Sequence, residues 1–257
     1  MFPASAWARR SDPVADQTCS LHVPPMTDDA QPQLREKHPP LINAPALVVA
    51  MTLLLIGLHA AYTFAPIAQQ QSILFDFALA PERFWAPAGS PYVYPDYASG
   101  LITLASTALL HADWMHVLVN AFMLLAFGTP VARAFGNSIT GWGLWMIVFL
   151  GSVIGGSALY LALATESSSY AVGASGGVCG LIAAAFLLDP RGGKRKLWSP
   201  EFLKLTSAIV IANVLLTVAA PFLLGMGLAW EAHAGGYIAG ALLMTVLPVR
   251  GYREPQS

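Results

Sequence analysis

Residues 171–188 read AVGASGGVCGLIAAAFLL, a stretch with four glycines and no charged side chain. An apolar run of about this length is typical of a helix that crosses a bilayer, which needs about 20 residues. Glycine costs a helix about 1 kcal/mol relative to alanine. In membrane helices it is kept where another backbone approaches closely. The stretch therefore predicts a membrane-spanning helix that packs tightly against a neighbour.

The composition of the whole chain favours a membrane protein. Of its 257 residues, 56% are hydrophobic and only 11% are charged, with a mean hydropathy of +0.58. An ordinary soluble domain has about 25% charged residues. The net charge of −1, without a basic patch between aromatics, argues against a nucleic-acid partner. Cys19 and Cys179 lie in a polar and an apolar stretch, so no disulfide framework is expected.

The chain divides into a polar beginning and an apolar remainder. Residues 1–43 are rich in proline and charge and lack the apolar core of a signal peptide, so we expect a disordered cytoplasmic tail there. The membrane domain is expected over 44–250, followed by a short cytoplasmic tail at 251–257.

Six windows in the membrane domain are apolar enough for a span, which predicts an all-α bundle of six transmembrane helices. The windows are 46–64, 113–134, 141–164, 171–188, 202–224 and 228–249. Six spans place both termini on the same side of the membrane.

The positive charges indicate which side that is, because short cytoplasmic loops carry the excess of Lys and Arg. Twelve of the 13 cationic residues fall on the side of the termini, and Arg83 alone falls on the other. Both termini are therefore expected to be cytoplasmic. The long 65–112 connection is expected outside, as a loop whose aromatics sit at the membrane interface. The twelve are Arg9, Arg10, Arg35, Lys37, Arg133, Arg191, Lys194, Arg195, Lys196, Lys204, Arg250 and Arg253.

Polar side chains inside spans are candidate functional groups, because burying them in a bilayer is costly. His116 and Asn120 lie four residues apart near the start of the second span and share one helix face. His111 lies just before them. Interhelical hydrogen bonding is the structural alternative for such residues.

Ser175 and His233 each lie among glycines. Small neighbours leave the Ser175 hydroxyl accessible, and a helix start offers free backbone N–H groups. His233, Gly236 and Gly240 share one face of the sixth span. If this face packs on the glycines of the fourth span, Ser175 and His233 come within hydrogen-bond reach, as a histidine base needs to activate a serine.

The expected depth of these residues in the membrane agrees with a common site for Asn120, Ser175 and His233. The second, fourth and sixth spans all run inward from the outer face, and a helix rises about 1.5 Å per residue. Asn120, Ser175 and His233 then lie at similar depth near that face.

These residues resemble the motifs of the rhomboid intramembrane serine proteases. Rhomboids have six spans, with His-x4-His-x3-Asn opening the second, Gly-x-Ser-Gly opening the fourth and His-x2-Gly-x3-Gly in the sixth. The similarity covers about residues 44–250. The matching residues are His111, His116 and Asn120, then Gly173, Ser175 and Gly176, then His233, Gly236 and Gly240.

The resemblance implies a Ser–His dyad that needs no metal or other cofactor. Ser175 would be the nucleophile and His233 the general base and acid. His116, Asn120 and the Ser175 backbone N–H would bind the oxyanion. His111 and the motif glycines, Gly173, Gly176, Gly236 and Gly240, would have supporting roles.

Two positions depart from the family pattern. Ile102 and Thr103 stand where many members have Trp-Arg, so the outer loop is expected to be anchored differently, with Trp85 as the candidate. Cys179 stands where an aromatic ring usually stacks on the catalytic histidine. The imidazole of His233 therefore loses a packing partner.

The implied substrates are single-span membrane proteins, cut near the outer face after lateral access between the second and fifth spans. The implied location is the bilayer of a bacterial inner membrane.

The main alternative is an inactive rhomboid-like protein that binds transmembrane segments. A metal site built from His111, Asp113, His116, Glu231 and His233 lacks a ligand motif and leaves Ser175 unexplained. A transporter is disfavoured because no internal repeat is evident. The oligomeric state is left open.

Overall fold

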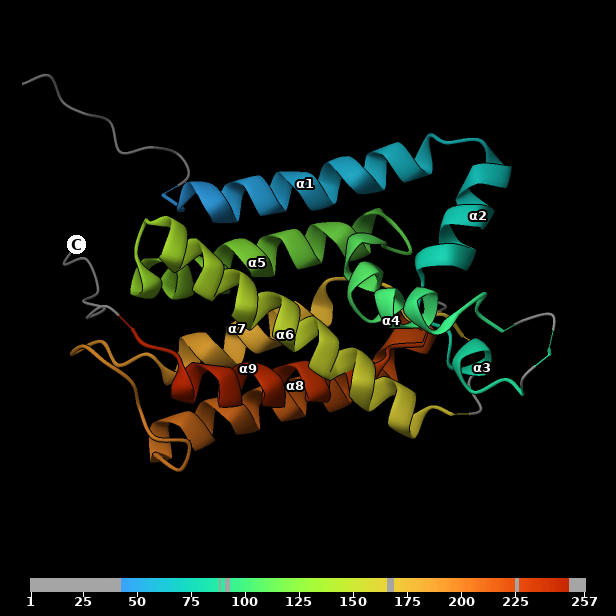
Figure 1. Ribbon diagram of the computed structural model, residues 1–257. Helices are drawn as coiled ribbons and strands as arrows, with labels where there is room; N and C mark the ends of the chain where they lie inside the picture. Colours follow the sequence, from blue (N-terminus) through green and yellow to red (C-terminus); the bar gives the residue numbers. More distant parts are fainter. Residues whose placement is uncertain (1–42, 88, 91–92, 166–168, 225–226, 250–257) are drawn as a thin grey trace, which may run out of the picture. The chain divides into compact units, whose positions relative to one another are not determined.

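The computed structural model describes residues 43–87, 89–90, 93–165, 169–224 and 227–249 (Figure 1). The tails expected at 1–43 and 251–257 lie outside these residues, apart from Asn43. Regular structure in the described part is helical, and two isolated β-bridges are its only extended pairings. The prediction of an all-α fold is confirmed for the described residues.

Nine α-helices and one 3-10 helix occur in the described residues. They are α1 (Ala46–Thr63), α2 (Ile67–Phe77), α3 (Pro81–Phe84), α4 (Tyr97–Ser106), η2 (Thr107–Leu109), α5 (Trp114–Phe135), α6 (Ile139–Leu163), α7 (Ser175–Leu187), α8 (Pro200–Leu224) and α9 (Trp230–Val246).

Four of these helices are long and apolar enough to cross a membrane: α1, α5, α6 and α8, the last over Pro200–Ala219. The fourth and sixth predicted windows form the shorter helices α7 and α9, of 13 and 17 residues. At about 1.5 Å per residue α7 is only about 20 Å long. It begins later than predicted, because the φ of +121° at Gly173 is incompatible with an α-helix there, and α7 starts only at Ser175.

The connection over 65–112 differs from the expected loop, since it contains α2, α3, α4 and η2. The Asp96 carboxylate caps α4 by accepting a hydrogen bond from the Ser99 N–H at 2.7 Å. That hydrogen bond holds the pKa of Asp96 below its ordinary value. The predicted anchor is confirmed, because the Trp85 indole N–H donates to the Leu161 carbonyl of α6 at 3.0 Å.

The most extensive helix contacts are among α6, α7 and α9, and α5 packs on both α1 and α7. Nine of the 13 residues of α7 are buried, so this helix lies at the centre of the bundle. Large side chains from α5, α6 and α7, such as Leu124, Trp145, Phe149 and Leu181, fill the core around it.

Glycines allow α9 to approach two helices at once. A Cβ on Gly236 would overlap the Gly176 carbonyl of α7, and one on Gly240 would overlap the backbone of Gly180. On the other side, a Cβ on Gly235 would lie 2.6 Å from the Gly155 carbonyl oxygen of α6. The glycine faces inferred from the sequence therefore form the interfaces of α9.

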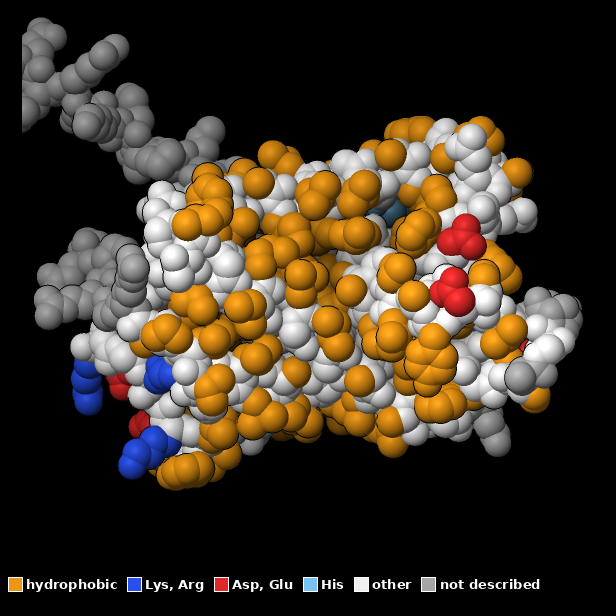
Figure 2. Space-filling view, in the orientation of Figure 1, with side chains coloured by type: hydrophobic (Ala, Val, Ile, Leu, Met, Phe, Trp, Pro, Cys, Tyr) orange, Lys and Arg blue, Asp and Glu red, His pale blue; other side chains and the backbone are white. Residues whose placement is uncertain are grey.

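Helix α8 is much less enclosed than the other long helices. Only 6% of its most apolar window is buried, against 28–44% in α1, α5 and α6. Most of its exposed side chains are apolar, among them Ile211, Val214 and Leu215. Figure 2 shows a broadly hydrophobic face with Lys and Arg gathered at one end, as expected for a protein embedded in a bilayer.

Candidate active site

Ser175 is the first residue of α7, directly after the turn at Gly173. The positive φ of Gly173 favours glycine, and a Cβ there would lie 2.7 Å from ring atoms of His116. Both the conformation and the space thus require glycine two residues before the serine.

The segment before Ser175 is held by several hydrogen bonds. Ala171 pairs with Leu79 through backbone bonds of 2.8 and 3.2 Å, and its carbonyl also accepts from the Thr107 hydroxyl. The Ala174 N–H donates to Nε2 of His111 at 3.4 Å. His111 is buried, so the structure places it beneath the turn that presents Ser175.

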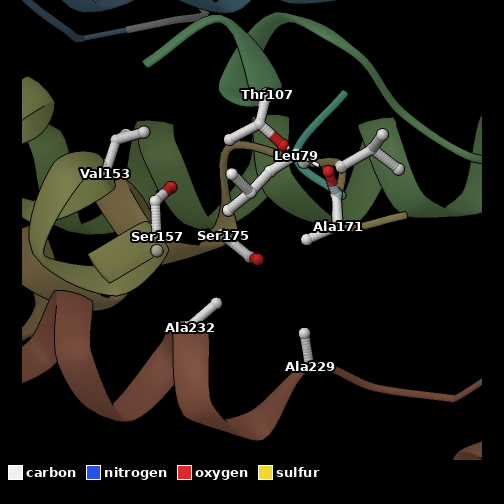
Figure 3. A pocket seen from close by; sticks show the side chains of 11 residues that line it. Leu79, Thr107, Val153, Ser157, Ala171, Ser175, Ala229 and Ala232 are labelled. Atoms are coloured by element: carbon white, nitrogen blue, oxygen red, sulfur yellow. Dashed lines mark hydrogen bonds between the residues drawn. The ribbon is translucent and has the colours of Figure 1, made fainter. Parts of the chain in front are cut away.

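The Ser175 hydroxyl points into a small cavity between α7 and the start of α9 (Figure 3). The cavity has a volume of about 30 Å³, which is enough for water. Ala229 and Ala232 form its wall on the α9 side, and Thr107 and Ser157 contribute polar atoms. The Ser175 hydroxyl is therefore accessible from this cavity rather than buried in the core.

His233 lies one turn into α9, and its Nδ1 is 2.9 Å from Oδ1 of Asn213 on α8. The imidazole lines a second and larger cavity, of about 480 Å³, between α7, α8 and α9. In the described residues no hydrogen bond joins it to the Ser175 hydroxyl.

The backbones that carry Ser175 and His233 nevertheless touch. A Cβ on Gly176 would lie 3.3 Å from the Ala232 carbonyl oxygen. The residue after the serine therefore packs on the residue before the histidine. The two side chains therefore come from the first turns of two adjacent helices.

His116 and Asn120 lie on α5 beside this region. The Asp113 carboxylate caps α5 by accepting from the His116 N–H at 2.9 Å, which fixes the start of the helix. The His116 ring packs against the Gly173 turn and lies 5.2 Å from the His111 ring, centroid to centroid. Asn120, which is only 4% exposed, donates through Nδ2 to the His116 carbonyl at 3.0 Å.

The remaining polar candidates form no evident metal centre. The described residues contain no group of three or more His, Cys, Asp and Glu side chains arranged to hold a metal ion. The His59 ring packs edge-on against Trp114 at 4.8 Å and lies 6.2 Å from the His111 ring.

Asn213 is a polar residue near the site that sequence reasoning missed. It is the only amide side chain in the apolar window 202–224. The rule that singled out His116 and Asn120, polarity inside a span, also applies to it. Its partner could not be read from the sequence, because that depends on how α8 is rotated against α9.

Comparison with known proteins shows the family of this chain. The family model of the Rhomboid domain matches residues 98–250, more than half of the chain. The chain belongs to the rhomboid family.

Individual relatives share 30–34% of the aligned residues with this chain. RHOMBOID-like protein 4 of Arabidopsis thaliana is 34% identical over 57% of this chain and 34% of its own length. Rhomboid-like protein 11, chloroplastic, of the same plant is 32% identical over 42% of this chain and 36% of its own length. An uncharacterized protein of Mycobacterium tuberculosis is 30% identical over 60% of this chain and 62% of its own. The matched region thus spans about a third of the plant proteins and less than two thirds of the mycobacterial one.

Proposed function

We propose that this protein is an intramembrane serine endopeptidase with Ser175 as nucleophile and His233 as general base. The observation that carries the proposal is the position of Ser175. It opens the central helix, follows an obligatory glycine turn, and directs its hydroxyl into a cavity walled by the first turn of α9.

The proposed reaction follows the chemistry of acyl transfer. The Ser175 oxygen attacks the carbonyl of the scissile peptide while its proton passes to Nε2 of His233. The protonated imidazole then gives that proton to the leaving amine, and water hydrolyses the acyl-enzyme by the same route in reverse. The hydroxyl and imidazole have to approach each other when substrate binds, since catalytic hydrogen bonds often tighten only in that complex.

The oxyanion of the intermediate needs donors at the start of α7. As the first residue of a helix, Ser175 has a backbone N–H without an intrahelical acceptor. We assign the additional donors to the side chains of His116 and Asn120. The location of the His116 ring against the Gly173 turn supports this assignment.

We further propose that the substrates are single-span membrane proteins, cut near the outer face. The sparse contacts of α8 support lateral access beside this helix, between α5 and α8. The distribution of Lys and Arg supports cytoplasmic termini, and we propose a bacterial inner membrane as the location.

Cleavage of a membrane-spanning reporter by the full chain tests the proposal. Wild-type protein should cut the reporter and react with a fluorophosphonate probe. Ser175→Ala and His233→Ala should each abolish cleavage while the protein stays folded by circular dichroism. Retained cleavage in either variant would overturn the dyad.

A second candidate function is binding of transmembrane segments without cleavage. Two observations favour it: no hydrogen bond in the described residues joins His233 to Ser175, and Cys179 leaves space beside the imidazole. Wild-type protein that is folded, does not label with fluorophosphonate and still captures the reporter would support this function.

A further inference from the structure

Helix α8 carries one amide side chain, Asn213, and this side chain contacts the imidazole of His233. Its Oδ1 lies 2.9 Å from Nδ1 of His233. The only other described side-chain hydrogen bond between these two helices joins Thr206 to Tyr237, at 2.7 Å. Two polar contacts therefore connect a helix that otherwise packs loosely.

The Asn213 amide turns its Oδ1 toward the ring, and this orientation indicates where the imidazole proton lies. An amide oxygen can only accept a hydrogen bond, so Nδ1 of His233 carries the proton in this pair. In the neutral ring Nε2 then has a free lone pair, as a base that takes a proton from a serine requires.

We propose that Asn213 is a positioning residue that holds His233 in the tautomer and orientation of a general base. The role rests on the proposed protease function. Asn213 would not touch the substrate and would act through the imidazole alone.

The shape of the site explains why this contact matters. The imidazole borders a cavity of about 480 Å³, and the residue facing it from α7 is Cys179, which has a small side chain. On this side the ring therefore borders open space and a small side chain. A hydrogen bond of good length supplies the missing constraint.

Other titratable groups lie near the imidazole. Cys179 from α7 and Tyr237 from α9 line the same cavity, and His116 of α5 interacts with His233 electrostatically. The Tyr237 hydroxyl is already paired with Thr206. Neither Cys179 nor Tyr237 makes a described hydrogen bond to His233, which leaves Asn213 as the polar partner of the ring.

Steady-state kinetics of reporter cleavage, measured as a function of pH on the full chain in bicelles, tests the role. Asn213→Leu should lower kcat at least about tenfold with little change in KM, because a misoriented base loses much of its contribution. Asn213→Asp should retain more activity than Asn213→Leu. It should also move the acid limb of the pH profile upward, since a carboxylate stabilises the imidazolium.

Thr206→Val is the matched control, because it removes the other hydrogen bond between α8 and α9 without changing side-chain volume. It should leave the pH profile unchanged. Asn213→Leu with wild-type kcat would overturn the proposal. So would equal losses in Thr206→Val and Asn213→Leu with no recovery in Asn213→Asp.

Nitrogen-15 NMR of histidine-labelled protein separates this proposal from the protease function, because it needs no activity. The His233 signals, assigned by difference from His233→Ala, should show a protonated Nδ1 in the wild type and a mixture of tautomers in Asn213→Leu. A protonated Nε2 in the wild type, or identical spectra in both, would refute the role of Asn213. A wild type that shows the expected tautomer but cuts no reporter would refute only the protease.

Discussion

Gly236 and Gly176 pack backbone to backbone, so closely that a Cβ on Gly236 would overlap the Gly176 carbonyl oxygen. The two glycines neighbour the functional candidates, since Gly176 follows Ser175 and Gly236 lies one turn after His233. The separation of the serine and histidine backbones is therefore fixed by contact between two residues that have no side chains.

Replacing Gly236 with alanine should destabilise the protein. The added methyl group has no space between α9 and α7, and such overpacking costs about 1–3 kcal/mol. Gly143→Ala in α6 is the control, because no atom lies within 4 Å of its added Cβ and alanine favours a helix by up to about 1 kcal/mol. Denaturant unfolding in detergent should show a lower free energy of unfolding for Gly236→Ala and an equal or higher one for Gly143→Ala, each relative to the wild type. Equal behaviour would contradict the contact.

Lys194 should stabilise the C-terminal end of α9. Its ammonium donates to the carbonyls of Met244, Thr245 and Leu247 at 2.7–2.9 Å. Carbonyls at the C-terminal end of a helix have no intrahelical N–H partner. Lys194→Met should lower the free energy of unfolding by about 1–3 kcal/mol. The exposed Lys196, changed to Met in the same way, should have little effect on that free energy.

Two serines of α6 should respond in opposite directions to alanine substitution. The buried Ser152 hydroxyl has no hydrogen-bond partner among the described residues, whereas the Ser157 hydroxyl donates to the Leu104 carbonyl at 2.9 Å. Ser152→Ala should be neutral or stabilising, and Ser157→Ala should cost about 1 kcal/mol. Thermal unfolding of both variants checks this. A destabilised Ser152→Ala would indicate a partner for that hydroxyl.

Arg83 should hold the segment between α2 and α4 together. Its guanidinium lies 3.5 Å from the Phe75 ring centroid and 4.0 Å from that of Tyr94, and it donates to the Phe75 carbonyl. A cation over a desolvated ring contributes about 2 kcal/mol. Arg83→Met should therefore speed hydrogen exchange of the amides around 75–94. Glu82→Gln, an exposed neighbour, should leave exchange there unchanged.

Much of this arrangement could be predicted from the sequence. Hydrophobic length located α1, α5, α6 and α8 closely, and glycine spacing indicated which faces of α7 and α9 meet. The shortening of α7 could not be predicted, because it depends on a positive φ at Gly173. The helices within 65–112 were missed because a search for long apolar runs passes over short ones. The Asn213–His233 contact depends on the rotation of α8, which an evenly apolar helix does not encode.

In the proposed protease, the loose packing of α8 would link substrate access to catalytic reactivity. Any outward movement of α8 that opens a path beside it also separates Asn213 from His233, because α8 holds one partner and α9 the other. While the path is open, the histidine lacks the contact that orients its ring. A segment would thus be admitted by one state of the protein and cut by another, so cleavage would wait until α8 has closed.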